Sequence, residues 1–147
     1  MKTAKAINRL KYIIDIAPNL LTDISEENFA TKHTSTKWSK KEILGHLIDS
    51  ATINHHRFVR GQFEKYPEII YDQNKWNTFG FYQEIHREQL INFWAIYNLQ
   101  LLEIIKRISS NNLTNQIRIG NDFLTLQFLI NDYVEHLEHH LKQIIEY

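Results

Sequence analysis

Residues 125–146 read TLQFLINDYVEHLEHHLKQIIE, and apolar side chains recur along this stretch with the period of an α-helix. Thr125 stands just before the first apolar residue and has a side chain suited to an N-cap. The stretch therefore predicts an amphipathic helix over residues 125–146 that packs one face against other helices. The middle of that face is formed by Leu126, Tyr133, Leu137, Leu141 and Ile144.

Three other stretches carry the same period, at residues 5–21, 39–58 and 81–108. In the second of them, Ser39 and Glu42 form an S-x-x-E capping box, which is typical of a helix start. Four amphipathic helices in a chain of 147 residues indicate an all-α fold, a four-helix bundle that forms one domain over residues 1–147.

The connections between these helices are expected to be mostly irregular. Residues 61–80, GQFEKYPEIIYDQNKWNTFG, contain two glycines and a proline without a sustained period, and they predict a loop. A short helical turn is expected at residues 25–29. Residues 109–123, SSNNLTNQIRIGNDF, predict a second loop, in which residues 112–119 suit a short extended piece.

Charge and cysteine content exclude several classes of function. The 17 Lys and Arg residues balance 17 Asp and Glu residues, so we expect no binding to nucleic acid or to an anionic membrane. The chain contains no cysteine, which excludes disulfides, thiolate zinc sites and a cysteine nucleophile. We expect no signal peptide and no membrane-spanning segment, and hence a cytoplasmic protein.

Three histidines have the placement of a metal site. His136 and His140 lie one helical turn apart, so their rings project from the same face. His46 lies in the second predicted helix, and all three fall on the shoulders of apolar faces, at the edge of a core. If the two helices pack together, three imidazoles form a metal site with an open position, which is typical of catalytic sites. We expect a divalent ion, first Zn or Ni and then Mn or Fe.

An alternative interpretation needs no metal. Eight histidines make one H-x-x-x-H pair unsurprising, and ordinary hydrogen bonds at the edge of the core explain it as well. The pair is not an H-E-x-x-H peptidase motif, and no nucleophile elbow, phosphate-binding glycine loop or dinucleotide motif occurs. The remaining histidines are expected near the surface: His33, His55, His56, His86 and His139.

Four polar residues near the predicted site are further candidates. Asp49 and Asp132 each stand within one turn of a predicted ligand, where they could accept a hydrogen bond from its N–H or simply lie at the surface. Asn54 and Arg57 could reach an anionic substrate, although the pattern favours a solvated helix face. Glu42 is interpreted as part of the cap and not as a catalytic base.

Three motifs, in this order, resemble a known family. Residues 38–58, WSKKEILGHLIDSATINHHRF, are similar to the second-helix signature of the DinB/YfiT-like proteins, through W-S-x-x-E, H-L-x-D-S and N-x-x-R-F. Residues 71–76, YDQNKW, resemble a loop segment of that family. Residues 133–144, YVEHLEHHLKQI, resemble its last-helix pattern, H-x-x-H-H-L.

The resemblance implies a four-helix bundle that holds a divalent metal through His46, His136 and His140, the residues that helical spacing also selects. It implies homodimers, and a metal-dependent hydrolase or a thiol S-transferase that uses bacillithiol. The wider family includes mycothiol-dependent isomerases and damage-inducible proteins. We expect the chain to lack the additional domain that some thiol-dependent members carry.

We therefore expect a metal-dependent enzyme that acts on a small molecule. Its catalytic group is either metal-bound water or an exogenous low-molecular-weight thiol, bound as thiolate. One rival interpretation is a non-catalytic metal-binding or stress-response module, in which a fourth ligand closes the site. The other is a plain interaction bundle whose histidines carry no ion.

Overall fold

The structure, a computed structural model, describes residues 2–147. Within that range no helix has the length and apolar character needed to cross a membrane. The described elements are α1 (Lys2–Thr22), α2 (Glu26–Ala30), α3 (Lys40–Arg60), α4 (Gln73–Phe79), the 3₁₀ turn η1 (Tyr82–Glu84), α5 (Arg87–Ile105), the 3₁₀ turn η2 (Asn112–Thr114), β1 (Gln116–Ile119), β2 (Asp122–Thr125) and α6 (Leu126–Leu141).

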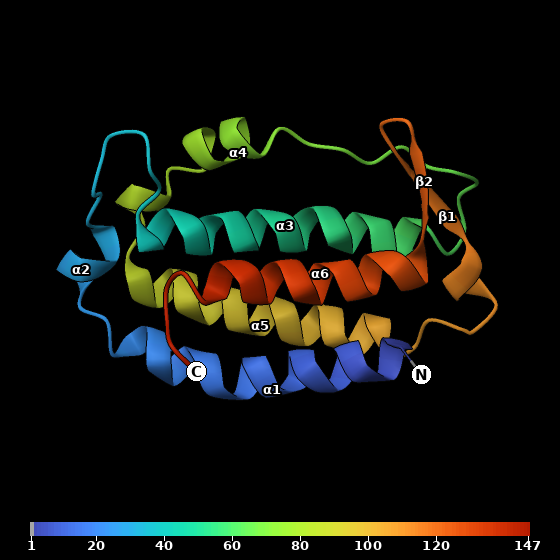
Figure 1. Cartoon of the computed structure of the whole chain (residues 1–147), viewed down its shortest axis with the longest axis horizontal. Coiled ribbons are helices and arrows are strands. Elements are labelled where there is room, and N and C mark those ends of the chain that lie inside the picture. Colours follow the sequence, from blue (N-terminus) through green and yellow to red (C-terminus); the bar gives the residue numbers. More distant parts are fainter. Residues whose placement is uncertain (1) are drawn as a thin grey trace.

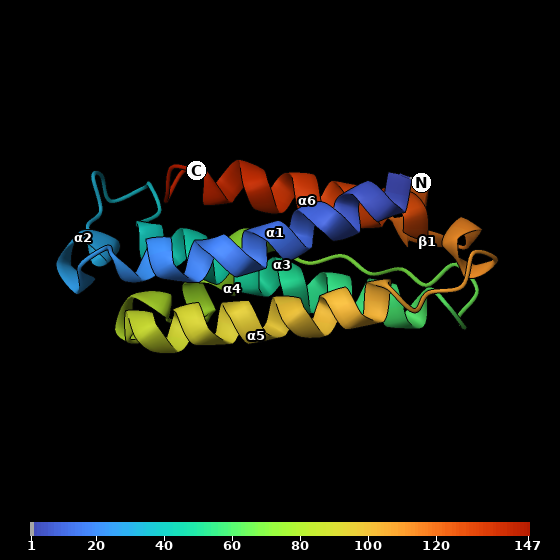
Figure 2. The same ribbon diagram turned by 90° about the horizontal axis from the view of Figure 1, so that it is seen from below.

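Four long helices, α1, α3, α5 and α6, lie along the long axis of the molecule (Figure 1 and Figure 2). Both α1 and α3 pack against α5 and α6. Helices α1 and α6 run in one direction, and α3 and α5 run in the other (Figure 1). Because α3 and α5 are parallel, residues 61–86 carry the chain back along the bundle between them. The predicted four-helix bundle is confirmed.

The parallel arrangement of α3 and α5 determines which ends of the helices meet. Helices α3 and α6 are antiparallel neighbours, although they lie far apart in the sequence. The beginning of α3 therefore lies beside the end of α6. This is the geometry that a site shared by His46, His136 and His140 requires.

Local signals begin two of these helices where the sequence predicts. The Ser39 hydroxyl accepts a hydrogen bond from the Glu42 backbone N–H, and the Glu42 carboxylate accepts one from the Ser39 N–H, both at 3.0 Å. This confirms the capping box of α3. Thr125 caps α6 by accepting from the Phe128 N–H at 3.1 Å. At its other end α6 stops at Leu141, short of the predicted residue 146.

The third predicted helix begins later than expected. Phe81 adopts a left-handed backbone with φ of 57°, and Tyr82–Glu84 form η1. Helix α5 starts only at Arg87, where the side chain of His86 accepts a hydrogen bond from the Glu88 N–H. The apolar residues before His86 belong to a separate packed turn, and their spacing mimics a continuation of the helix.

Two elements contradict the prediction of irregular loops. Residues 73–79 form α4, which Asp72 caps by accepting from the Lys75 N–H at 3.0 Å. Strands β1 and β2 form an antiparallel hairpin that turns through Gly120, whose φ is 61°. The extended piece expected within residues 112–119 is present as β1, but its partner strand was not predicted. Segments this short carry too few residues to display a period.

The turn η1 packs directly on α3 at Gly45. A Cβ atom placed on Gly45 would lie 2.2 Å from ring carbons of Tyr82. The missing side chain lets the Tyr82 ring approach α3, where its hydroxyl donates a hydrogen bond to the Asp49 carboxylate. Both Tyr82 and Asp49 are buried. Glycine destabilises the interior of a helix relative to alanine. Its presence in α3 is explained by the close packing of Tyr82, which leaves no room for a side chain.

We predict that Gly45→Ala destabilises the protein by about 1–3 kcal/mol, because the new methyl group must displace the Tyr82 ring. Urea denaturation measures the change. In a Tyr82→Ala background the same substitution should instead stabilise by up to about 1 kcal/mol, since alanine is the better helix former. Equal destabilisation in both backgrounds would contradict this packing explanation.

Candidate metal centre

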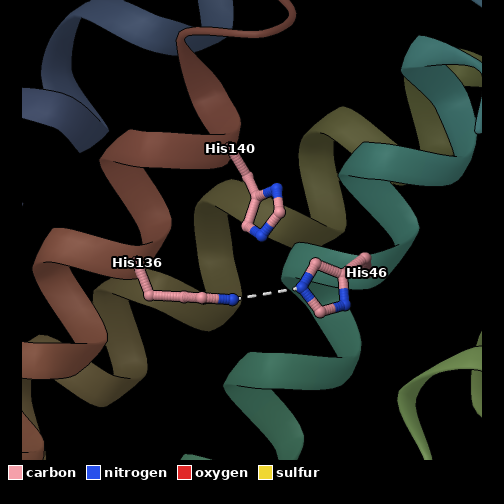
Figure 3. A group of neighbouring side chains, drawn as sticks. All are labelled: His46, His136 and His140. Carbon is pink, nitrogen blue, oxygen red and sulfur yellow. Dashed lines mark hydrogen bonds between the residues drawn. The ribbon is translucent and has the colours of Figure 1, made fainter.

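Three histidines from two helices converge where α3 meets α6. His46 projects from α3, and His136 and His140 project from successive turns of α6 (Figure 3). The Nε2 atoms of His46 and His136 are 3.2 Å apart. One nitrogen from each of the three rings lies within 4.8 Å of the other two. The structure thus brings together the three residues that the sequence selects.

The local environment keeps two of these rings neutral. Burial, and then the nearby His136 and His140, lower the pKa of His46 to about 3. Burial, followed by His140 and His139, lowers the pKa of His136 to about 4. Neutral imidazole is the form whose ring nitrogen can offer a lone pair. His46 and His136 therefore present electron-pair donors, and not cations, near pH 7.

His46 is buried more deeply than its predicted shoulder position indicates, with only 1% of its surface exposed. Its second nitrogen, Nδ1, is buried and has no hydrogen-bond partner among residues 2–147. Figure 3 shows this nitrogen on the side of the ring that faces away from His136 and His140. Such an unsatisfied polar atom costs about 1–3 kcal/mol.

Two neighbours of the cluster were not predicted. The Nδ1 atom of His140 lies 3.1 Å from the Gln143 side-chain oxygen. Because that oxygen only accepts, the contact assigns an N–H to Nδ1 of His140, so Nε2 is the nitrogen left for a metal. The Trp38 ring packs on His46 with ring centroids 5.0 Å apart. Gln143 follows His140 by three residues, a spacing that would have indicated the contact.

The remaining histidines lie outside this cluster. His33, His56, His86 and His139 are exposed, as expected. His55 differs from its predicted surface position, because it is half-buried and its Nδ1 lies 2.9 Å from the Tyr97 hydroxyl.

The two candidate aspartates occupy different environments. Asp49 is buried, which contradicts the surface alternative for this residue. One of its oxygens accepts from Tyr82, and the other is buried without a partner among the described residues. Burial raises the pKa of Asp49 to about 6, although the Tyr82 hydrogen bond opposes this rise. Asp132 is exposed.

Asn54 and Arg57 do not lie on a solvated helix face, so that interpretation is wrong for both. Asn54 is buried and its amide donates to the Ser50 carbonyl at 2.9 Å. Arg57 is half-buried, and its Nε and Nη2 donate to the Ile69 carbonyl at 3.3 and 2.9 Å. Apolar spacing misses this burial because the segment that covers α3 comes from the predicted loop.

The two glutamates near the cluster have structural partners. Glu42 completes the α3 cap, as predicted, and also pairs with Lys32 at 2.7 Å. Glu138 lies between the two α6 histidines in sequence but turns toward α1, where it accepts from Arg9 at 2.9 and 2.6 Å. Neither carboxylate is therefore available as a general base beside the histidines.

Comparison with known proteins places the fold. The sequence model of the DinB superfamily matches residues 10–144. The structure of YfiT from Bacillus subtilis, described as "a probable metal-dependent hydrolase with an unusual four-helix bundle topology", aligns with a TM-score of 0.87 at 17% identity. That alignment covers 97% of this chain and 83% of YfiT. No curated protein sequence matches the chain.

A second similar fold is that of a mycothiol-dependent maleylpyruvate isomerase. Its structure aligns with a TM-score of 0.79 at 10% identity over 97% of this chain, but over only 60% of the isomerase. A variant of the isomerase with one histidine replaced by alanine aligns with a TM-score of 0.80 at 8% identity, over the same shares of the two chains. The chain thus corresponds to about three fifths of the isomerase.

The buried neutral histidines predict that the metal-free protein loses stability in acid. The pKa of His46 falls from 6.5 to about 3 on folding, so between these values the unfolded chain binds a proton that the folded chain does not. The protonation of His46 therefore does not reduce the free energy of unfolding above pH 6.5, but it reduces it progressively as the pH falls from 6.5 toward 3. At about pH 5 the loss attributable to His46 is about 2 kcal/mol.

Urea denaturation of the parent and of His46→Asn, at about pH 7 and about pH 5, measures this loss. Asp49, whose pKa is raised to about 6, acts in the opposite sense and is present in both proteins. Between about pH 7 and about pH 5, the free energy of unfolding should fall by about 2 kcal/mol more in the parent than in His46→Asn. Equal losses would contradict the burial of a neutral His46.

Proposed function

The chain belongs to the DinB superfamily, and we propose that it is a divalent-metal-dependent enzyme that acts on a small molecule. The observation that carries the proposal is the convergence of His46, His136 and His140. Three protein ligands leave coordination positions for water or substrate, as in catalytic zinc sites and unlike closed structural ones. The description of YfiT as a probable metal-dependent hydrolase supports the same function.

The three residues fit such an ion in chemistry, and His46 and His136 also fit it in the spacing of their nitrogens. Two nitrogens bound at about 2.0–2.1 Å to one tetrahedral zinc lie about 3.3 Å apart, close to the 3.2 Å between the Nε2 atoms of His46 and His136. His140 offers its Nε2 lone pair because its Nδ1 is engaged by Gln143. A site of three imidazoles suits Zn and Ni best, and Fe or Mn next.

We propose two reaction classes, hydrolysis and thiol S-transfer. A bound divalent ion supplies Lewis acidity, which activates either water or an exogenous thiol. The chain has no cysteine of its own, which is compatible with a bacillithiol-type thiol that arrives as a small molecule. The mycothiol dependence of the similar isomerase supports the second class. No protein side chain is proposed as the nucleophile.

A second candidate is a plain interaction bundle, or a non-catalytic metal-binding and stress-response module. The contact between the Nε2 atoms of His46 and His136 favours the plain bundle, because a hydrogen bond there gives both nitrogens a partner without an ion. Metal content separates this candidate from the others. A coordination position that exchanges with added ligand separates the enzyme from a closed metal-binding module.

Asp49 is proposed to orient His46. The unpartnered Nδ1 of His46 and the unpartnered oxygen of Asp49 are both buried, and the two residues stand three apart on α3. Side chains at this spacing are neighbours on a helix. A ligand histidine commonly donates its other N–H to a carboxylate, which fixes the tautomer and the ring. A hydrogen bond between these two atoms would satisfy both.

Three broader expectations are proposed along with this function. The chain acts as a single domain, as a homodimer and in the cytoplasm. The absence of cysteine supports a reducing compartment. Exposed apolar side chains on α5, among them Phe93 and Ile96, supply a surface on which a second copy can pack.

Metal content tests the proposal directly. Tag-free protein should carry close to one divalent ion per chain by mass spectrometry, and His46→Ala and His140→Ala should lose it while remaining folded. His139→Ala is the matched control, because His139 lies next to His140 but is exposed. If the parent holds no metal even after incubation with Zn, Ni, Mn and Fe, the metal-dependent proposal is contradicted and the plain interaction bundle is the remaining candidate.

The role of Asp49 has its own test. We predict that Asp49→Asn lowers metal affinity about 10–100-fold, the usual effect of removing an outer-shell carboxylate. Tyr82→Phe removes the hydroxyl that binds Asp49 but keeps the carboxylate, so metal affinity should be retained. Competition with a chromophoric chelator measures both. Equal losses in the two variants would indicate that Asp49 serves only to hold η1.

A further inference from the structure

Arg57 is a half-buried cation that no acidic group neutralises directly. The ion pairs formed within residues 2–147 do not include it. Its Nε and Nη2 both donate to the Ile69 carbonyl. No hydrogen bond from Nη1 is found in the described chain, and Nη1 is not among the buried unpartnered atoms, so it reaches solvent. Holding a cation in this setting costs free energy unless an anion compensates.

The guanidinium is held in place by a fixed backbone segment. The Ile69 N–H donates to the Arg118 carbonyl at 3.3 Å, and the Arg118 N–H donates to the Pro67 carbonyl at 3.0 Å. The segment that runs along α3 is thereby tied to strand β1. Because Ile69 cannot shift freely, Arg57 presents its remaining N–H edge in one position. Such preorganisation is what a binding site needs.

Arg57 lies on the same strip of α3 as His46. The two residues are eleven apart, which is about three helical turns, so their side chains project from one face about 16 Å apart along the axis. A long helical side chain leans toward the N-terminus of its helix, and His46 lies in that direction along α3. The strip between them is occupied by Ser50 and Ile53, both buried.

Two residues lie near the Arg57 guanidinium. Burial, and then the charge of Asp49, raise the pKa of Tyr71 to about 12, and the charge of Arg57 opposes this rise. Tyr71 therefore lies close to both Asp49 and Arg57. The hydroxyl of Tyr71 makes no hydrogen bond within residues 2–147 and remains a neutral donor. Asp132, on α6, interacts electrostatically with Arg57 without forming an ion pair. Its negative charge weakens the attraction for a second anion.

We propose that Arg57, with Tyr71 beside it, binds a carboxylate at the far end of the substrate whose reactive end lies at the three histidines. This inference rests on the proposed function. One guanidinium, partly offset by Asp132, matches a group of single negative charge better than a phosphate of double charge. The ligand is an extended small molecule whose carboxylate and reactive atom lie roughly 10–15 Å apart.

The test uses a series of thiols of increasing length on the cobalt-substituted protein: mercaptoacetate, mercaptohexanoate, mercaptooctanoate and mercaptoundecanoate, each with its carboxamide. Binding of the thiolate is followed by its charge-transfer absorption. A charge-assisted hydrogen bond predicts that the long carboxylates bind about tenfold more tightly than their carboxamides. Mercaptoacetate is too short to reach Arg57, so it should not bind about tenfold more tightly than its carboxamide.

Variants test whether Arg57 causes the tighter binding of the long carboxylates. Arg57→Gln should abolish the difference between carboxylate and carboxamide but retain the affinity for neutral mercaptoethanol. Asp132→Asn removes a negative charge near Arg57, so it should increase the difference in affinity between carboxylate and carboxamide. Loss of folding would not produce such an increase. Lys65→Gln, which removes an exposed cation from the same connecting segment, is the matched control and should leave the difference unchanged.

The outcomes separate this inference from the proposed function. If mercaptoethanol binds the cobalt protein but no carboxylate exceeds its carboxamide, the carboxylate site is overturned and the metal enzyme stands. A carboxylate gain that persists in Arg57→Gln also overturns the assignment. If the chain binds no cobalt, the metal proposal fails and this inference fails with it. If cobalt is bound but accepts no thiol, the thiol S-transfer class and this inference fail, while a metal-dependent hydrolase stands.

Discussion

The antiparallel contact between α3 and α6 is the interaction on which the rest of the site depends. A histidine near the start of one helix meets two histidines near the end of the other only because the helices run in opposite directions. That direction follows from the long return of residues 61–86, which makes α3 and α5 parallel. The same return lays Tyr82 against Gly45 and Ile69 against Arg57. One choice of topology thus assembles the cluster and its surroundings.

Burial gives the cluster its chemical character. Imidazoles that are withdrawn from water lose their proton, and a neutral ring either pairs with another polar group or binds a cation. His46 and His136 satisfy one nitrogen each through their mutual contact, but Nδ1 of His46 and one oxygen of Asp49 stay unpaired. Unpaired buried groups cost stability and are concentrated at functional sites. The two unpaired atoms lie behind the histidine cluster, where the proposed hydrogen bond between Asp49 and His46 would satisfy both.

The sequence predicts the long helices and the pair of His136 and His140 because these depend on local spacing. His46 joins them in the prediction only on the condition that the two helices pack together. A period of 3.6 residues places His136 beside His140, and the capping box sets the start of α3 at Ser39. What could not be predicted depends on contacts between distant segments. The burial of His46 and Arg57 comes from packing against α6 and the connecting segment. The later start of α5 follows from the turn at Phe81, whose neighbours are apolar at helical spacing without being helical.

The proposed site consists of three imidazoles that hold one ion with a position left open for substrate. X-ray absorption spectroscopy at the zinc edge of the zinc-loaded protein tests it most directly. We expect three imidazole nitrogens at about 2.0–2.1 Å and, after a small thiol is added, a sulfur at about 2.3 Å in place of a light ligand. A shell of four protein ligands that the thiol does not change would contradict it, as would zinc bound by fewer than three imidazoles.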